Sequence, residues 1–142
     1  MHFSRAGIMS SLEVRCYMAK KVRFYRCPVC HSVVELIDDE GQSLTCCGQQ
    51  MELLQAKTEG PESEYHLPVV KRQDGVLYIN VGQKMHPQSP DHHIAFIVLV
   101  TKRTVRRSDI NANEAPATLF NEKDHGDVYV YCTCDGLWKI SF

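Results

Sequence analysis

The sequence lacks any long apolar run. No stretch of its 142 residues approaches the roughly 18 consecutive apolar side chains that a membrane-spanning helix requires. Residues 1–17 also lack the apolar core of about seven residues on which an export signal depends. We therefore expect a cytoplasmic protein that does not enter a membrane. In that reducing compartment, cysteines are expected to bind metal rather than to form disulfides.

The sequence also has little net charge. Lysine and arginine together number 16, aspartate and glutamate 17, which leaves a formal charge of −1. This balance argues against the broad basic surface typical of proteins that bind nucleic acid. Internal repeats and low-complexity tracts are absent, and no segment shows the spacing of a long amphipathic helix.

The chain does contain two separate groups of metal-ligating side chains. The first is Cys27-Pro28-Val29-Cys30, followed by the adjacent pair Cys46-Cys47. The second consists of three imidazoles and a thiol, spread along the rest of the chain: His66, His86, His92 and Cys132. Four thiolates suit a closed metal site, whereas a mostly imidazole set suits an open one.

The cysteine group permits more than one metal. A Cys-x-x-Cys segment brings two sulfurs to one ion, and a second pair completes a tetrahedral site. Because Cys46 and Cys47 are adjacent, the angle at the metal is expected to be strained. A structural zinc ribbon and a one-electron iron site are both consistent with this spacing, and a disulfide pair is the least favoured interpretation.

Composition divides the chain into four segments. Residues 1–17 form a leader or a mis-assigned start, and Cys16 within it has no expected role. Residues 18–56 carry the four cysteines, residues 57–63 form a linker, and residues 64–142 form a second domain. A unit of about 40 residues rarely folds without a metal, a disulfide or a partner, so the first domain requires its metal.

The second domain is predicted to consist of strands. Asp74-Gly75 is a strong hairpin signal, because both residues tolerate positive φ. Other strand-like segments alternate or are dense in β-branched residues, and they are 67–71, 76–81, 94–101, 128–132 and 137–142. Several short strands separated by turns indicate an all-β fold of the sandwich type.

Several motifs give the chain a family resemblance from about residue 18 to residue 142. Residues 25–30 and 45–51 look like the desulforedoxin-type domain of desulfoferrodoxin. The remainder resembles the superoxide reductase (neelaredoxin) domain of the same family, through residues 64–69, 81–87, His92, 131–132 and 136–139. The resemblance implies a small rubredoxin- or desulforedoxin-like metal domain followed by a seven-stranded immunoglobulin-like β-sandwich.

The resemblance also implies two irons per chain. One is held by the four thiolates Cys27, Cys30, Cys46 and Cys47, where zinc is an alternative. The other is ferrous iron bound by His66, His86 and His92, with Cys132 as an axial thiolate and an open sixth position. The implied reaction reduces superoxide to hydrogen peroxide, with electrons from a rubredoxin-like donor. The family also implies a homodimer.

The sequence departs from the family pattern at two places. The position that matches the fourth imidazole is Asp135. Either Asp135 binds the iron, or water does, or another side chain replaces it. The candidates for replacement are His93, His125 and Cys134, and all three are less favoured than Asp135 or water.

The second departure precedes the first imidazole. The family commonly has Glu-Lys-His, whereas this chain has Glu64-Tyr65-His66. Glu64 therefore matches the residue that closes the sixth position after oxidation, and the lysine that attracts superoxide is missing. Lys84 is a candidate for the missing positive charge, and a solvated loop lysine is the alternative interpretation.

Three functional hypotheses follow. The first is a superoxide reductase with a modified iron site. The second is a non-catalytic iron protein, either an electron carrier or a redox-responsive module, whose second site is degenerate because of Asp135. The third and weakest is a zinc-stabilised binding module without a redox role.

Overall fold

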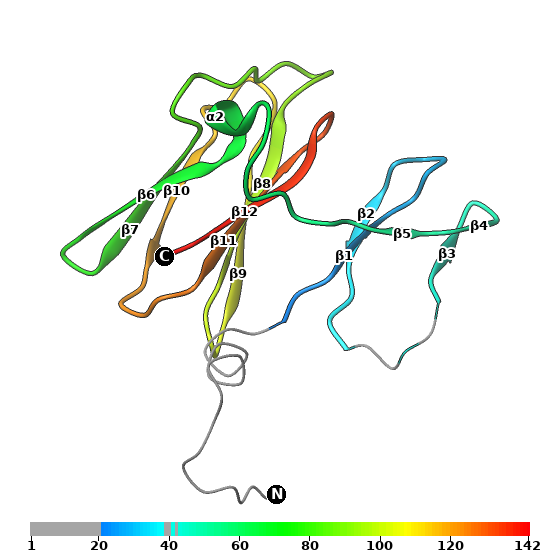
Figure 1. Ribbon diagram of the computed structural model, residues 1–142, viewed down its shortest axis with the longest axis horizontal. Coiled ribbons are helices and arrows are strands. Elements are labelled where there is room, and N and C mark those ends of the chain that lie inside the picture. The colour runs from blue at the N-terminus through cyan, green and yellow to red at the C-terminus, as the bar shows by residue number, and fades with distance from the viewer. Residues whose placement is uncertain (1–20, 39–40, 42) are drawn as a thin grey trace, which may run out of the picture.

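The computed structural model describes residues 21–38, 41 and 43–142 (Figure 1). The predicted leader, residues 1–17 with Cys16, lies outside the described residues. Two groups of strands are present, one before residue 54 and one after residue 67. Within the described part of the chain, no helix is long and apolar enough to cross a bilayer.

The first group of strands surrounds the four cysteines. β1 (Phe24–Arg26), β2 (Val33–Glu35) and β5 (Glu52–Leu53) form an antiparallel sheet in the order β2-β1-β5. β3 (Thr45–Cys46) and β4 (Gln49–Gln50) form a separate two-stranded ribbon. Cys47 and Gly48 make the turn of this ribbon with φ values of 54° and 75°. Two successive positive φ values are the signature of a tight hairpin turn.

The second group is a sandwich of seven strands in two antiparallel sheets, as predicted. One sheet has the order β10-β7-β6 and the other β12-β11-β8-β9. The strands are β6 (Pro68–Gln73), β7 (Val76–Val81), β8 (Ile94–Val100), β9 (Val105–Asp109), β10 (Ala117–Asn121), β11 (Asp127–Cys132) and β12 (Gly136–Ser141). The predicted hairpin at Asp74-Gly75 joins β6 to β7, with φ values of 51° and 78°. A one-turn helix, α2 (Ser63–His66), precedes β6.

The core lies between the two sheets. Along β7, Leu77, Ile79 and Val81 point inward and are buried, as the two-residue period of a strand requires. β8 is apolar almost throughout, because its sheet is covered on both faces. The pairing of β8 with β11 contains an irregularity, since Tyr131 pairs with Phe96 but Cys132 pairs with Ile94. Bulges of this kind redirect side chains at the end of a sheet.

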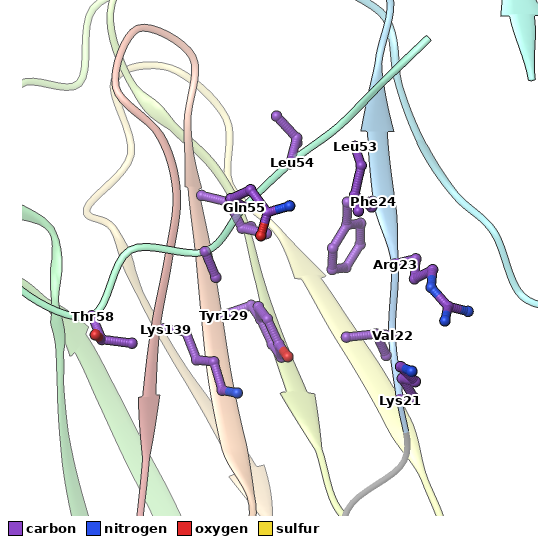
Figure 2. A pocket seen from close by; sticks show the side chains of 12 residues that line it. Lys21, Val22, Arg23, Phe24, Leu53, Leu54, Gln55, Thr58, Tyr129 and Lys139 are labelled. Atoms are coloured by element: carbon purple, nitrogen blue, oxygen red, sulfur yellow. The ribbon is translucent and has the colours of Figure 1, made fainter.

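The cysteine-rich unit covers the outer face of the four-stranded sheet. Phe24 of β1 is buried there, with its ring centroid 5.6 Å from that of Phe96 and 6.0 Å from that of Tyr129. A groove remains between the two units, and Phe24, Leu53, Tyr129 and Lys139 are among the residues that line it (Figure 2). The two units therefore share part of one hydrophobic core.

Candidate metal centres

The four predicted thiol ligands of the first unit meet at one point. Their sulfur atoms all lie within 4.8 Å of one another. Sγ of Cys30 is 3.7 Å from Sγ of Cys46, which is 3.9 Å from Sγ of Cys47. Four sulfurs bound at about 2.3 Å to one tetrahedral ion lie about 3.8 Å apart. The spacing therefore fits a tetrahedral metal and excludes disulfides, and all four cysteines are free.

The local backbone prepares these sulfurs for a cation. The N–H groups of Val29 and Cys30 both donate to Sγ of Cys27 at 3.4 Å. The hydrogen bond with Ser32 lowers the pKa of Cys30 to about 6. Hydrogen bonding with Cys27 and Cys30 raises the pKa of Cys46 to about 12. Four thiols this close cannot all ionise beside one another unless a cation compensates their charge.

The second group gathers at one end of the sandwich. His66 ends α2, His86 lies in the loop between β7 and β8, and His92 precedes β8. Cys132 is the last residue of β11, and Asp135 lies in the turn that leads to β12. One donor atom from each of these five residues lies within 4.8 Å of all the others. The topology thus joins side chains that are up to 69 positions apart in the sequence.

Neighbouring donors in this group have the spacing of ligands around one ion. Nε2 of His66 lies 3.0 Å from Nε2 of His86, and Sγ of Cys132 lies 3.4 Å from the latter. Oδ2 of Asp135 lies 3.1 Å from Nε2 of both His66 and His92. At bond lengths of about 2.1 Å, adjacent ligands of one metal are about 3 Å apart.

The histidine tautomers also require a cation. Nδ1 of His66 lies 2.8 Å from the carbonyl oxygen of Glu62, and Nδ1 of His86 lies 2.6 Å from that of Pro87. A carbonyl oxygen only accepts, so each Nδ1 carries the proton and each Nε2 presents a lone pair. Two lone pairs facing each other at 3.0 Å are repulsive. A metal ion between them converts both into ligands.

Burial and charge shift the pKa values of this group in opposite directions. Burial raises the pKa of Cys132 to about 11, although the N–H of Asp135 donates to its sulfur at 3.3 Å. Burial lowers the pKa of His86, which keeps it neutral. For Asp135, partial burial alone would raise the pKa, but His66, Cys132 and His92 together lower it. Asp135 is therefore ionised at neutral pH, and the Cys132 thiolate requires a metal.

The group is closed on one side and open on the other. His66 and His86 are 1% and 3% exposed, and Cys132 is fully buried. The side chains of His92 and Asp135 are 33% and 35% exposed. The indole of Trp138 stacks on His66 and covers the inner side. Among the described residues, His92 and Asp135 therefore form the accessible side of the group, from which a small molecule can approach.

Glu64 and Lys84, the other two predicted residues, contact each other. Nζ of Lys84 lies 3.3 Å from Oε2 of Glu64, and both side chains are about half exposed. The main-chain N–H of Lys84 also donates to the carbonyl oxygen of Glu64 at 3.0 Å. Between them, Gly82 has φ of 84°, and a Cβ there would lie 2.7 Å from the carbonyl oxygen of Tyr65. The loop that carries Lys84 is thus packed tightly against α2.

The alternative ligands lie elsewhere. Nδ1 of His93 contacts the carbonyl oxygen of Ser89, and Sγ of Cys134 contacts that of Asp91. His125 precedes β11, whereas Cys132 ends it, so the two residues are separated by the length of that strand. None of these three belongs to either metal-ligating group of the described residues. Of the candidates for the fifth ligand, Asp135 is the one whose side chain belongs to this group.

Two contacts of this group could not be predicted from the sequence. The carbonyl oxygen of Glu62, which orients His66, comes from a main-chain group that any residue type would supply. Lys57, in the expected linker, reaches the carbonyl oxygen of Asp135 with its ammonium group at 3.1 Å. These contacts depend on the approach of distant segments, and spacing along the chain does not reveal them.

The chain matches known proteins over most of its length. Residues 57–141 match the family model of desulfoferrodoxin, and residues 19–54 match that of the desulfoferrodoxin N-terminal domain. A desulfoferrodoxin homologue of Archaeoglobus fulgidus is 32% identical over 123 residues, which cover 86% of this chain and 98% of the relative. A superoxide reductase of Pyrococcus abyssi is 31% identical over 98 residues, covering 55% of this chain and 85% of the relative.

The fold has a counterpart among solved structures. The superoxide reductase of Treponema pallidum superposes with a TM-score of 0.69 at 22% identity, covering 84% of this chain and 97% of the other. Both parts of the chain, the four-cysteine unit and the sandwich, thus have matches in a single family. The chain belongs to the desulfoferrodoxin family.

Proposed function

We propose that this protein is a superoxide reductase, which converts superoxide to hydrogen peroxide by consuming one electron and two protons. The observation that carries the proposal is the open group of three imidazoles, one buried thiol and one carboxylate at the end of the sandwich. The family to which the chain belongs, and the relative from Pyrococcus abyssi described as a superoxide reductase, support it. We further propose that residues 18–56 and 64–142 each serve one metal.

The donor set suits iron at the second group. Imidazole, thiolate and carboxylate together offer the mixed nitrogen, sulfur and oxygen ligands that ferrous iron accepts. When bound there, ferrous iron would supply the electron for the reduction. His66, His86, His92 and Cys132 would hold it, and Oδ2 of Asp135 is placed to complete the set. The four thiolates of the first unit would hold a second iron, with zinc as the alternative.

The residues of this chain would contribute in different ways. Bound to iron, Cys132 would be an anionic, polarisable ligand that donates electron density, and its burial would protect it from water. Asp135 adds a further negative charge, which favours the ferric state. Lys84, which lies two residues before His86 and forms an ion pair with Glu64, would provide positive potential for an anionic substrate. Glu64 is thereby held in an ion pair at the surface.

The proposal includes partners. Each turnover consumes an electron, so a small donor protein of the rubredoxin type is required to return it. A homodimer is the assembly that the family resemblance implies. The cytoplasm is the compartment in which the free thiols of both groups would stay reduced.

The test is the stoichiometry of the reaction. Protein with iron in both groups should convert superoxide to peroxide in proportion to the reductant supplied, without evolving oxygen. Cys132→Ser should abolish this activity and leave the absorption of the four-thiolate iron unchanged. Evolution of one oxygen for every two superoxides consumed would indicate dismutation and would refute the proposal.

A second function is favoured by one observation, the carboxylate of Asp135 in the ligand group. Its negative charge repels an anionic substrate, so the chain would then act as a non-catalytic electron carrier or redox-responsive module. Asp135→His separates the two functions. A large gain in superoxide reduction would favour the carrier, whereas an unchanged, fast rate would favour the reductase.

A further inference from the structure

The segment that leads from the cysteine-rich unit to the sandwich is attached to β12 at Lys57. The N–H of Lys57 donates to the carbonyl oxygen of Leu137, and the N–H of Lys139 donates to that of Lys57, both at 2.9 Å. These bonds form an isolated parallel bridge to Trp138. Figure 1 shows the segment passing beside β12 before it reaches α2. The backbone of Lys57 is therefore fixed close to the turn that carries Asp135.

The side chain of Lys57 extends from this fixed backbone to Asp135. Its Nζ lies 5.0 Å from the centroid of the Trp138 ring and 3.1 Å from the carbonyl oxygen of Asp135. Nε1 of Trp138 donates to the same oxygen at 3.2 Å. A carbonyl oxygen has two lone pairs, and both are engaged here.

These contacts bear on the carboxylate of Asp135. Its side chain is 35% exposed and lies in the turn between β11 and β12, so solvent competes for it. The main chain of Asp135 is held at its N–H by the sulfur of Cys132 and at its carbonyl by Trp138 and Lys57. Fixing both ends of the residue restricts the directions in which the carboxylate can point. Oδ2 then stays 3.1 Å from His66 and His92.

We propose that Lys57 is a positioning residue of the second metal group, which acts by holding Asp135 in the ligand position. The inference rests on a metal site at this group, as in the proposed function, but not on superoxide as the substrate. Lys57 also joins the two units, because it belongs to the segment that follows β5. A residue of the connecting segment, Lys57, thus contacts Asp135, which is a proposed ligand in the sandwich.

The experiment measures metal affinity rather than activity. The full chain is first loaded with one equivalent of Zn²⁺, which the four thiolates prefer, and is then titrated with Co²⁺. Sulfur-to-cobalt charge-transfer absorption reports binding beside Cys132. Lys57→Met should weaken Co²⁺ binding about tenfold, at the lower end of the range for residues that orient ligands. Lys57→Arg, which keeps a cationic donor, should restore most of the affinity.

A double-mutant cycle tests whether the effect of Lys57 on metal affinity passes through Asp135. In the background of Asp135→Ala, Lys57→Met should have no further effect, because its effect passes through Asp135. Lys102→Met, in the turn between β8 and β9 at the other end of β8, is the matched control and should leave the affinity unchanged.

Three outcomes contradict the inference in different ways. Unchanged Co²⁺ affinity in Lys57→Met overturns the role of Lys57 and leaves the proposed function intact. An equal loss with and without Asp135 shows that Lys57 affects the site by a route other than Asp135, and also overturns it. Failure of the unaltered chain to bind Co²⁺ beside Cys132 overturns both this inference and the proposed function.

Discussion

The indole of Trp138 stacks on the imidazole of His66, with ring centroids 4.7 Å apart and an angle of 6° between the planes. Trp138 is 1% exposed, so this contact fixes the plane of His66 from the protein interior. The hydrogen bond from Nδ1 to Glu62 fixes its tautomer. Both restraints come from the protein itself, and a ligand that the protein orients loses less entropy when a metal binds.

The first prediction concerns the polar edge of this indole. Trp138→Phe keeps an aromatic ring against His66 but removes the N–H that donates to Asp135. We expect a loss of about 1–3 kcal/mol in the free energy of unfolding, from one hydrogen bond and a small cavity. Trp138→Ala should cost about 3–5 kcal/mol. Urea denaturation of the metal-free chain measures both values, and equal losses would show that the ring makes no contribution of its own.

The second prediction concerns the charge of Asp135. Asp135→His replaces an anionic ligand by a neutral one, which removes a charge that stabilises the ferric state. The midpoint potential of the second iron should rise by at least about 60 mV, a tenfold change in a one-electron equilibrium. An anaerobic redox titration of the thiolate-to-iron absorption measures it. An unchanged potential would mean that Asp135 does not contact the metal.

Much of the fold could be predicted from the sequence, because central strands carry strong patterns. Alternation along β7 and the turn at Asp74-Gly75 depend only on neighbouring residues. The edge strand β9 was not among the predicted segments. Its residues include Arg106, Arg107 and Asp109, and charged side chains at an edge hide the apolar alternation. β10 is likewise an edge strand and was also missed, although it carries no charged side chain: its five residues mix polar and apolar types and form only a short pattern.

The metal groups were predictable to a similar extent. The Cys-x-x-Cys segment has few other roles, whereas the ligand role of the three imidazoles followed from the family resemblance, and the structure brings the members of each group together. The contacts around these ligands were harder to predict from the sequence. Lys57 and Asp135 are 78 positions apart, and their contact depends on how the connecting segment pairs with β12. The ion pair between Lys84 and Glu64 similarly depends on how the loop folds back over α2.

The third prediction concerns Lys84. Lys84→Met removes a cation and leaves Glu64 without its partner, so the local potential becomes negative. At low salt, the rate constant for superoxide should fall by about threefold to tenfold, and the difference should shrink as ionic strength rises. Pulse radiolysis measures the rate. Lys84→Arg should retain it, and Lys102→Met is the control. An equal loss at low and high salt would exclude electrostatic attraction.

The fourth prediction concerns Gly82, which lies between α2 and the loop that carries Lys84. In Gly82→Ala, Cβ would lie 2.5 Å from the carbonyl oxygen of Lys84 and 2.7 Å from that of Tyr65, at φ of 84°. The clash involves main-chain atoms, so we expect a loss of about 2–4 kcal/mol in the free energy of unfolding. Gly60→Ala is the matched control, because Gly60 also has positive φ but no atom within 4 Å of its Cβ. A similar loss in both variants would attribute the whole cost to backbone conformation.

The fifth prediction concerns removal of metal from the four-thiolate group. Among the described residues of the cysteine-rich unit, the buried apolar side chains are few, namely Phe24, Cys27 and Met51, so we expect metal binding to supply much of its folding free energy. A chelator under reducing conditions should therefore abolish hydrogen-exchange protection in β1 to β5. The sandwich has its own core and should keep its protection. The exception should be β8 and β11, where Phe96 and Tyr129 lose the cover of Phe24 and exchange should quicken modestly. Simultaneous loss of protection in both units would show that they unfold as one cooperative structure. In that case, the shared core around Phe24 contributes more than the metal.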